Sequence, residues 1–413
     1  MRRNKLGRVV AAGLALTLVA GACSGDDDAS DPTSTSGAVV GTDGSTTSVA
    51  VGDALELSEA DALAAATTYA DSVYAAYSDV VAGAEELRTS IQAMVTTPSE
   101  ATLAATRQSW LAARDLYGPT EAFRFYDGPI DNPDTGPEGR INAWPLDEAY
   151  IDYTVDTPDS GLINDVANVP EITFEVLVAA NEQGGETNIS TGWHAIEFLL
   201  WGQDLNAQGP GARPASDYDT AANADRRGIY LVLLADLLVA DLTSVRDQWN
   251  PDGGEYRAEF LADPVKAVEK ILRGMGALSS GELAGERMAV AYETKEQEDE
   301  HSCFSDNTHN DIVGNARGIR LAYLGDREVT ESPSLSDVIA KLDPELDNDL
   351  RKQIDNNISA AENLPTPFDQ LILADDEDPG RAELLDLIED LQSQGDAIAS
   401  LASRLGLEIS IEI

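Results

Sequence analysis

The sequence predicts an all-α protein whose two helical-bundle domains follow a signal peptide and a flexible tether. Apolar residues make up 43% of the 413 residues, which is enough to build hydrophobic cores. Alanine and leucine are common while aromatic residues contribute only 6%, a balance that favours helices over a β-sandwich. Helix-capping signals recur along the chain, and alternating strand patterns do not.

The amino terminus has the features of a secretory signal. A basic start precedes an apolar stretch, residues 9–22, that is too short to span a bilayer comfortably. This stretch runs into Cys23 and resembles the lipobox of bacterial lipoproteins, except that Ala20 stands where leucine is usual. We therefore predict a lipoprotein signal peptide at residues 1–22 and lipidation of Cys23. A plain cleaved signal peptide is the alternative.

Residues 23–56 are predicted to form a disordered tether, because Asp, Ser, Thr and Gly dominate their composition. Such a tether would hold a folded body away from a membrane. Because one lipid chain binds weakly, two or more acyl chains would be needed for the anchor. The sequence thus predicts an extracytoplasmic, membrane-anchored bacterial lipoprotein at the cell surface or in the periplasm.

The chain is strongly acidic, with a formal net charge of −47 at pH 7. Removal of the signal peptide would take away four basic residues and no acids, so the mature charge would be more negative still. Such a surface repels nucleic acid and attracts cations. We expect no nucleic-acid partner; solubility in a salty environment explains the charge equally well.

Helix signals follow one another along the body of the chain. Residues 58–61 predict a capping box that opens a long Ala-rich helix. Thr97 as the cap, Pro98 in the first turn and the acidic Glu100 predict the start of the next helix. Further helices are predicted over residues 230–249, 264–275 and 381–405.

Two long irregular stretches interrupt the helices, at residues 127–157 and 203–219. Loops of this length inside compact domains are usually functional. The second stretch also suggests a domain boundary. We therefore predict an N-terminal helical bundle at residues 57–207 and a C-terminal helical bundle at residues 208–413.

The chain has only three histidines, and they fall in two clusters. His194 and Glu197 lie three residues apart in an apolar run, so a helix would place them on one face. Glu298 and His301 have the same spacing in reverse order, and His309 follows. On two antiparallel helices the pairs would face each other, as in di-iron bundles, which use Glu-x-x-His. A metal or proton-transfer site, a packed core pair and a solvated helix end all remain open.

A third constellation recurs at helical intervals and comprises Arg114, Tyr117, Glu121 and Arg124. A buried salt-bridge network is one interpretation. In the other, Glu121 supports the metal site and an arginine orients it. His-Glu-x-x-His, Gly-x-Ser-x-Gly and phosphate-loop motifs are absent from the sequence. Cys303 would have no intramolecular partner if Cys23 is lipidated, and we expect it to be buried and inert.

Several motifs, in order, resemble those of the imelysin-like proteins, also called the M75 peptidase family. Gly192, His194 and Glu197 match the Gly-x-His-x-x-Glu motif of that family. The segments that continue the resemblance are 121–125, 128–131, 136–146, 198–204 and 298–309. The resemblance implies two helical bundles with a site near their interface, an extracytoplasmic location, a link to iron uptake and a peptidase label.

Three functions follow as hypotheses. The first is a lipid-anchored protein that binds iron, or an iron-bearing ligand, and works with iron-transport components. Its predicted ligands are His194, Glu197, Glu298 and His301, with Glu121, Arg124, Asp306 and His309 in support. Iron suits such a site best, and zinc or copper would bind less selectively. The second is a metallopeptidase with Glu197 as general base. The third is a surface docking protein without a metal.

Overall fold

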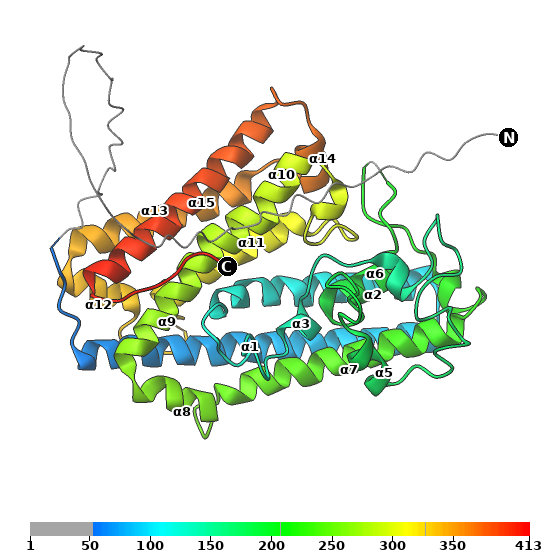
Figure 1. The fold of residues 1–413 in the computed structure, drawn as a ribbon, viewed down its shortest axis with the longest axis horizontal. Helices are drawn as coiled ribbons and strands as arrows, with labels where there is room; N and C mark the ends of the chain where they lie inside the picture. Colours follow the sequence, from blue (N-terminus) through cyan, green and yellow to red (C-terminus); the bar gives the residue numbers. More distant parts are fainter. Residues whose placement is uncertain (1–52, 207, 327) are drawn as a thin grey trace, which may run out of the picture. The chain divides into compact units, whose positions relative to one another are not determined.

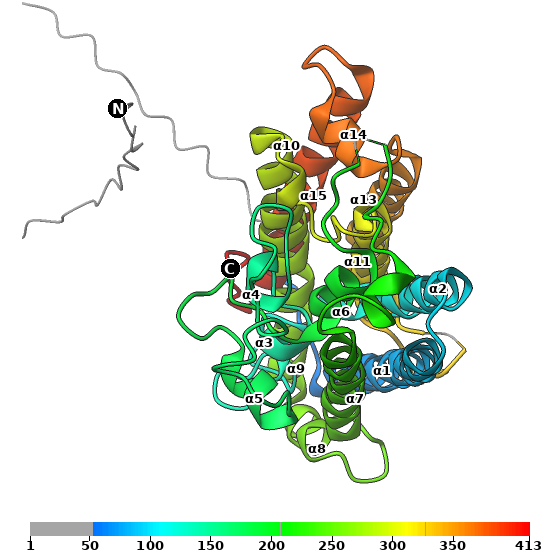
Figure 2. The ribbon, with the colours of Figure 1, turned by 90° about the vertical axis from the view of Figure 1, so that its right-hand side faces the viewer.

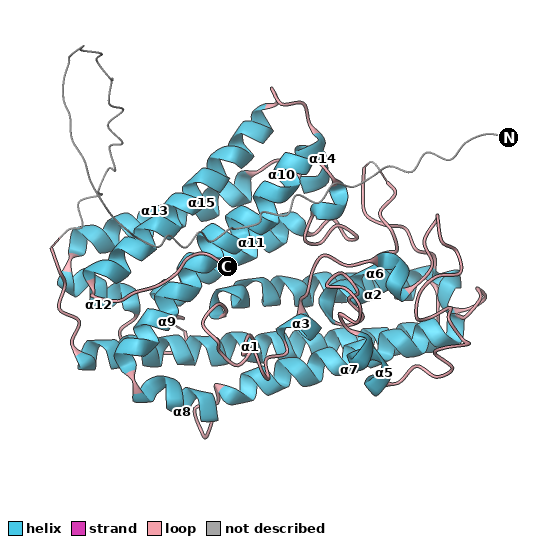
Figure 3. Cartoon of the chain, in the orientation of Figure 1, coloured by secondary structure: helices cyan, strands magenta, loops and turns pink. Residues whose placement is uncertain are grey.

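The computed structural model describes residues 53–206, 208–326 and 328–413, and these residues form helices and loops without a β-strand (Figures 1 and 3). The all-α prediction is confirmed. The predicted signal peptide, the lipidated Cys23 and the tether as far as residue 52 lie outside the described residues.

The first group of long helices surrounds α1 (Glu59–Thr96), which packs along α2 (Glu100–Tyr117) and α7 (Ala224–Gln248). Figure 1 shows these helices running along the lower half of the view. The hydroxyl of Ser58 caps α1 as predicted, by accepting from the backbone N–H of Asp61. The cap of α2 is Ser99 rather than Thr97, because Ser99 and Thr102 form a reciprocal capping box.

The second group follows later in the chain. Helix α13 (Pro344–Asn363) packs against α11 (Thr308–Leu324), α12 (Leu335–Leu342) and α15 (Pro379–Arg404). Both α13 and α15 begin with a proline in the first turn after an aspartate cap, a common way to start a helix. The short α14 (Phe368–Leu373) lies at the end of this group next to α15.

One continuous helical rod connects the two groups. It consists of α9 (Pro264–Ala277), the π-helix η3 (Leu278–Ala289) and α10 (Val290–Thr294). Figures 1 and 2 show this rod rising from α8 (Glu255–Ala262) toward α14. Its α9 part packs on α1 and α15, and its η3 part packs on α15 and α11. The rod therefore brings residues of η3 to the region between the groups.

Short elements cover the remaining chain and carry most of the irregular stretches. They are η1 (Gly118–Phe123), α3 (Glu138–Ile141), α4 (Glu148–Ile151), α5 (Phe174–Ala180), α6 (Gly192–Trp201), η2 (Ala215–Tyr218) and η4 (Gln297–Asp299). Buried ion pairs tie the two long irregular stretches together. The carboxylate of Asp152 lies 2.7 Å from the guanidinium groups of both Arg213 and Arg227. These loops are therefore fixed in place.

Elements from both sides of residue 207 share one core, since α7 packs on α1 and α6. The division predicted at residues 207 and 208 stays a prediction. Helix α7 is also long and apolar enough to cross a membrane, but buried residues line it from Ala224 to Val245. At the start of the body, Leu55 donates its backbone N–H to the carbonyl of Arg404 over 2.8 Å, so ordered packing begins before α1.

Candidate metal site

Helix α6 carries the first half of the site. Gly192 opens it with φ +89°, and a Cβ there would lie 2.5 Å from the carbonyl oxygen of Ile141. Only glycine fits both the backbone conformation and this close approach. The next turn places His194 and Glu197 side by side, with 2.9 Å between His194 Nδ1 and Glu197 Oε2. The helical spacing predicted for this pair is present in the structure.

His301 supplies the second half and meets His194 directly. The two Nε2 atoms are 3.3 Å apart, and the ring centroids are 4.7 Å apart. Both side chains are deeply buried, with residue exposures of 1% for His194 and 4% for His301. The Trp144 ring covers them, its centroid 4.9 Å from that of His194. Two histidines separated by 107 residues in the sequence therefore converge at one point.

A carboxyl group lies behind each imidazole. Glu197 bonds His194 through Oε2, and its Oε1 accepts from the backbone N–H and the hydroxyl of Ser305 at 2.9 and 2.7 Å. Asp311 Oδ2 lies 2.8 Å from Nδ1 of His301, and its two oxygens also accept from Arg114 at 3.0 and 3.1 Å. Each Nδ1 thus faces a carboxyl oxygen, while the two Nε2 atoms face each other.

Close packing between helices brings Asp311 to Arg114. Helix α11 lies tightly against η1, and a Cβ on Gly318 would come within 2.3 Å of the carbonyl oxygen of Pro119. This approach sets the first turn of α11, with Asp311, beside the last turn of α2, with Arg114. Glycine at position 318 therefore helps to position the carboxylate of Asp311, which lies about two turns earlier on α11.

The two carboxyl groups differ in charge. Burial alone would raise the pKa of Asp311, but Arg114 and His301 hold it well below its usual range. Burial raises the pKa of Glu197 to about 8, against the opposing hydrogen bonds of Ser305. Asp311 is therefore ionised near neutral pH and Glu197 is protonated. The environment separates two chemically similar acids into two charge states.

Both histidines are neutral for the same physical reason. Burial lowers the pKa of His301 to about 4, with a further contribution from Arg287, and it lowers the pKa of His194 well below the usual range. Because ionised Asp311 only accepts, we assign a proton to Nδ1 of His301. Arg114 Nη2 lies 3.2 Å from that nitrogen, farther than Asp311. The Nε2 lone pair of His301 consequently points at His194.

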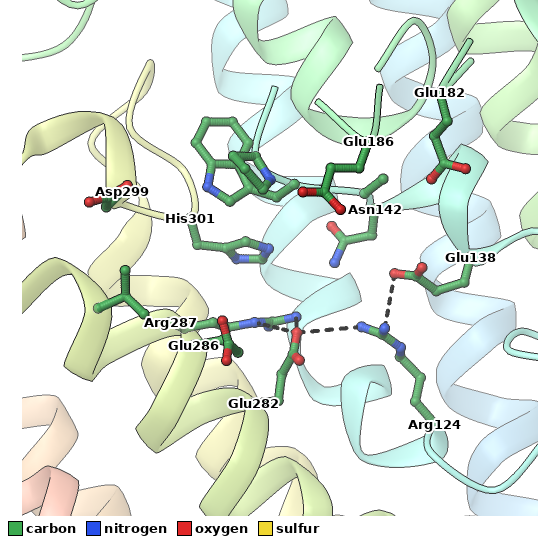
Figure 4. A pocket seen from close by; sticks show the side chains of 14 residues that line it. Arg124, Glu138, Asn142, Glu182, Glu186, Glu282, Glu286, Arg287, Asp299 and His301 are labelled. Atoms are coloured by element: carbon green, nitrogen blue, oxygen red, sulfur yellow. Dashed lines mark hydrogen bonds and ion pairs between the residues drawn. The ribbon is translucent and has the colours of Figure 1, made fainter. Parts of the chain in front are cut away.

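A pocket of about 520 Å³ opens onto His301 (Figure 4). Arg124 and Arg287 lie on its floor, joined by Glu282 and Glu138, and the dashed lines of Figure 4 trace this chain of ion pairs. The other labelled lining residues are Asn142, Glu182, Glu186, Glu286 and Asp299. Neither His194 nor Glu197 lines the pocket, so His301 is the member of the pair that faces the pocket.

The π-helix η3 explains how one segment supplies several lining residues. A π-helix bonds residues five apart, so Glu282 and Arg287 lie one turn from each other. Their side chains pair at 2.7 Å, and both line the pocket together with Glu286 and Val290. In an α-helix, residues five apart point in different directions. The π-helix is therefore an element that builds this site.

Glu121 anchors the pocket floor from below. Its Oε2 bonds Arg124 at 2.6 Å and also bonds Arg287, while Asn142 donates to its Oε1 at 3.4 Å. Burial would raise the pKa of Glu121, but the two arginines hold it well below its usual range. Asn142 also accepts from Arg114, which links the pocket floor to the His301 half. The buried salt-bridge interpretation of these residues matches the geometry.

Three predicted site residues lie apart from the histidine pair. Glu298 is exposed on η4 and lines a separate hollow of about 150 Å³ beside Cys303 and Glu148. His301 follows η4 in a turn, so the expected second helix with the spacing of Glu298 and His301 is not formed. His309 is half-buried in the first turn of α11 without a partner for Nδ1 among the described residues.

Asp306 has a positive φ of +56°. Burial raises the pKa of its carboxyl group, and the charges of two other acids, Asp204 and Asp369, raise it further. In the described part of the chain, Asp306 forms no hydrogen bond or ion pair with the histidine pair. Cys303 is buried, and burial raises the pKa of its thiol, which fits the expected inert role.

Four residues that build the site were missing from the predicted site: Asp311, Asn142, Arg287 and Ser305. Asp311 was the nearest signal, since it follows His309 by two residues in the sequence and lies in the first turn of α11. Arg287 and Asn142 carry no local signal, because their positions depend on the π-helix and on an irregular loop.

The histidine pair has chemical features of a metal site. Metal–imidazole bonds of about 2.0–2.1 Å place two nitrogens of one ion roughly 3 Å apart, close to the 3.3 Å between the Nε2 atoms. A carboxyl group behind each ligand nitrogen is the usual outer shell of such a site. Within the described residues no group of three or more His, Cys, Asp or Glu could hold a metal ion. The geometry therefore suits an ion that is bound by two imidazoles and has open coordination positions on the side of the pocket.

Comparisons with known proteins agree with the fold. The chain is 27% identical to iron-regulated protein A of Synechococcus elongatus over 309 residues, which cover 72% of this chain and 74% of the relative. The crystal structure of an iron-regulated protein A precursor from Parabacteroides distasonis superposes with a TM-score of 0.66 at 21% identity, covering 85% of this chain and 96% of that chain. An imelysin-like protein from Psychrobacter arcticum gives a TM-score of 0.62 at 16% identity, covering 86% of this chain and 99% of that chain.

The sequence profile described as Peptidase_M75, imelysin, matches residues 73–398. This span includes every residue of the histidine pair, its carboxyl partners and the pocket. The chain therefore belongs to the imelysin (M75) family.

Proposed function

We propose that this protein binds iron outside the cytoplasm and holds the ion between His194 and His301. One observation carries the proposal: two neutral, buried imidazoles present their Nε2 atoms to each other at 3.3 Å, and one of them lines an open pocket. Neutral imidazoles bind metal ions without first losing a proton from a charged ring. The iron-regulated name of the Synechococcus relative supports iron as the ion.

Of the four ligands predicted from the sequence, this proposal keeps the two histidines and leaves out Glu197 and Glu298. Glu197 acts from behind His194, because hydrogen bonds occupy both of its oxygens. Glu298 lines a different hollow. Two imidazoles with open positions for water suit ferrous iron, and they also suit copper and zinc. The lipid anchor at Cys23, and cooperation with iron-transport components, belong to the same proposal, since an anchored protein would hold iron close to a membrane.

Metal titration of purified protein tests the proposal. Anaerobic calorimetry with Fe²⁺, with Cu²⁺ and Zn²⁺ as comparisons, is expected to show one ion per chain. His194→Ala and His301→Ala are each expected to lower the affinity about 100-fold or more, since each removes one of the two ligands. His309→Ala is the matched control, because His309 lies outside the pocket, and it should bind like the wild type. Equal binding by wild type and both ligand variants would refute the proposal.

The geometry gives a peptidase less support. A general base must reach a bound water on the substrate side, but Glu197 is fully buried and does not line the pocket. Incubating metal-loaded protein with unfolded substrates would test this second function. Cleavage that disappears in Glu197→Gln, at unchanged metal content, would establish the peptidase role despite this geometry.

A further inference from the structure

The rim of the histidine pocket carries carboxylates that have no ion-pair partner among the described residues. Glu182 and Glu186 come from the loop between α5 and α6, Glu286 from the π-helix η3, and Asp299 from the end of η4. The first three are exposed and Asp299 is half-buried. Figure 4 shows Asp299 and Glu186 on either side of His301, Glu182 farther across the pocket near Glu138, and Glu286 beside Arg287. Three separate segments thus place free negative charges around one opening.

The floor arginines do not offset this rim. Arg287 pairs with Glu121 and Glu282, and Arg124 pairs with Glu121 and Glu138. Their positive charges are therefore neutralised inside the protein before a ligand arrives. Among the lining residues, six acids face two arginines. The pocket consequently has a negative potential, which its low-dielectric walls focus toward His301.

From this arrangement we infer that the pocket admits its metal as a hydrated divalent cation and rejects anionic chelates, with Glu182, Glu186 and Glu286 as the residues that select for charge. The inference rests on the proposed function and names the form of the ligand. An anionic complex, such as ferric citrate, would need unpaired cationic groups at the opening. Those groups are absent from the described lining, because both arginines are already paired. A hydrated cation instead gains from every rim charge.

The experiment measures the rate of association at low and high salt. Fe²⁺ is mixed anaerobically with the protein in a stopped-flow instrument, and the signal is tryptophan fluorescence, since Trp144 covers the histidine pair. The test variant combines E182Q, E186Q and E286Q. Removing three negative charges near the path of a divalent ion is expected to slow association roughly tenfold at 10 mM salt and less than about twofold at 0.5 M. The dissociation rate should stay unchanged, because no rim residue contacts the Nε2 atoms.

The matched control combines E383Q, D386N and E389Q. These three acids are exposed on α15, outside the pocket lining, and they change the net charge by the same amount. The control should associate at the wild-type rate. Equal slowing in both triple variants would show a general charge effect and overturn the inference.

Ferric citrate supplies the second arm. The wild type should bind it at least tenfold more weakly than Fe²⁺, and the rim variant should bind it no worse than the wild type does. Tighter binding of ferric citrate than of Fe²⁺ by the wild type would overturn the inference. Failure of the rim inference is distinct from failure of the proposed function, because His194→Ala tests the ion site itself in the same assay.

Discussion

The two halves of the histidine site are built in different ways. His194 and Glu197 lie on one regular helix, three residues apart, in an apolar run. His301 lies in a turn, and its carboxylate partner, Asp311, comes ten residues later on α11. The first half is a local sequence pattern, whereas the second half depends on how α11 packs against η1 and α2. The two imidazole–carboxyl pairs are therefore alike in chemistry, but one is formed within a single helix and the other by packing between helices.

The halves also differ in charge, and the difference follows from their construction. The carboxyl of Glu197 bonds Ser305 and His194 but forms no ion pair with an arginine or lysine, so burial dominates and raises its pKa to about 8. The carboxylate of Asp311 has the guanidinium of Arg114, which holds its pKa well below the usual range. One half thus carries a proton near neutral pH and the other carries a compensated negative charge. The following changes should break or sharpen this contrast.

The largest effect is expected from Arg114→Met. Arg114 is 1% exposed, and its removal would leave the Asp311 carboxylate buried without a cation. Breaking one side of such a buried pair costs about 3–5 kcal/mol in the free energy of unfolding. Urea unfolding of the metal-free protein measures this cost. Arg320→Met is the control, since the Arg320–Asp355 pair is exposed and should contribute about 0–1 kcal/mol. Similar costs for the two variants would mean that the charge contrast is unimportant for stability.

Glu197→Gln should have the next largest effect, on metal affinity rather than on stability. The glutamine amide can keep the hydrogen bonds from Ser305, but its NH₂ group would donate to Nδ1 of His194. That contact keeps the proton of the ring on Nε2, the nitrogen proposed to bind the ion. We expect a 10- to 100-fold loss in Zn²⁺ affinity by calorimetry. Ser305→Ala keeps the carboxyl group and should lose less than about threefold. A Gln variant that binds like the wild type would exclude a role for Glu197 behind His194.

The protonated Glu197 also predicts the pH dependence. Its pKa is raised in the folded state, so protonation favours folding, and this contribution falls as pH rises from about 4.5 to about 8. Metal binding runs in the opposite direction, because His194 needs its proton on Nδ1 and therefore an ionised Glu197. Zn²⁺ affinity should rise about tenfold per pH unit up to about pH 8 and then level off. Calorimetry in buffers of different ionisation enthalpy should detect release of about one proton at pH 7. No proton release would contradict the assigned charge state.

Much of the fold and half of the site could be predicted from the sequence. The capping signals at Ser58 and the proline at 264 mark real helix starts, because caps and first-turn prolines act locally. The pair of His194 and Glu197 was predictable for the same reason. Arg287 was not, because a π-helix turns its side chain into the pocket. Asp311 could not be assigned to the site, because the residues that surround it depend on how α11 packs against η1.

The smallest effect is expected at the residue for which the sequence pattern and the geometry differ most. Glu298 and His301 have the same spacing as His194 and Glu197, and that spacing indicates a shared face only within a helix. Because η4 ends at Asp299 and His301 lies in a turn, Glu298 points into a different hollow beside Glu148. Glu298→Gln should therefore leave metal affinity within about twofold of the wild type, far from the loss expected for Glu197→Gln. A loss of tenfold or more in calorimetry would mean that the turn closes around the ion and brings Glu298 to it, and the two halves would then be alike after all.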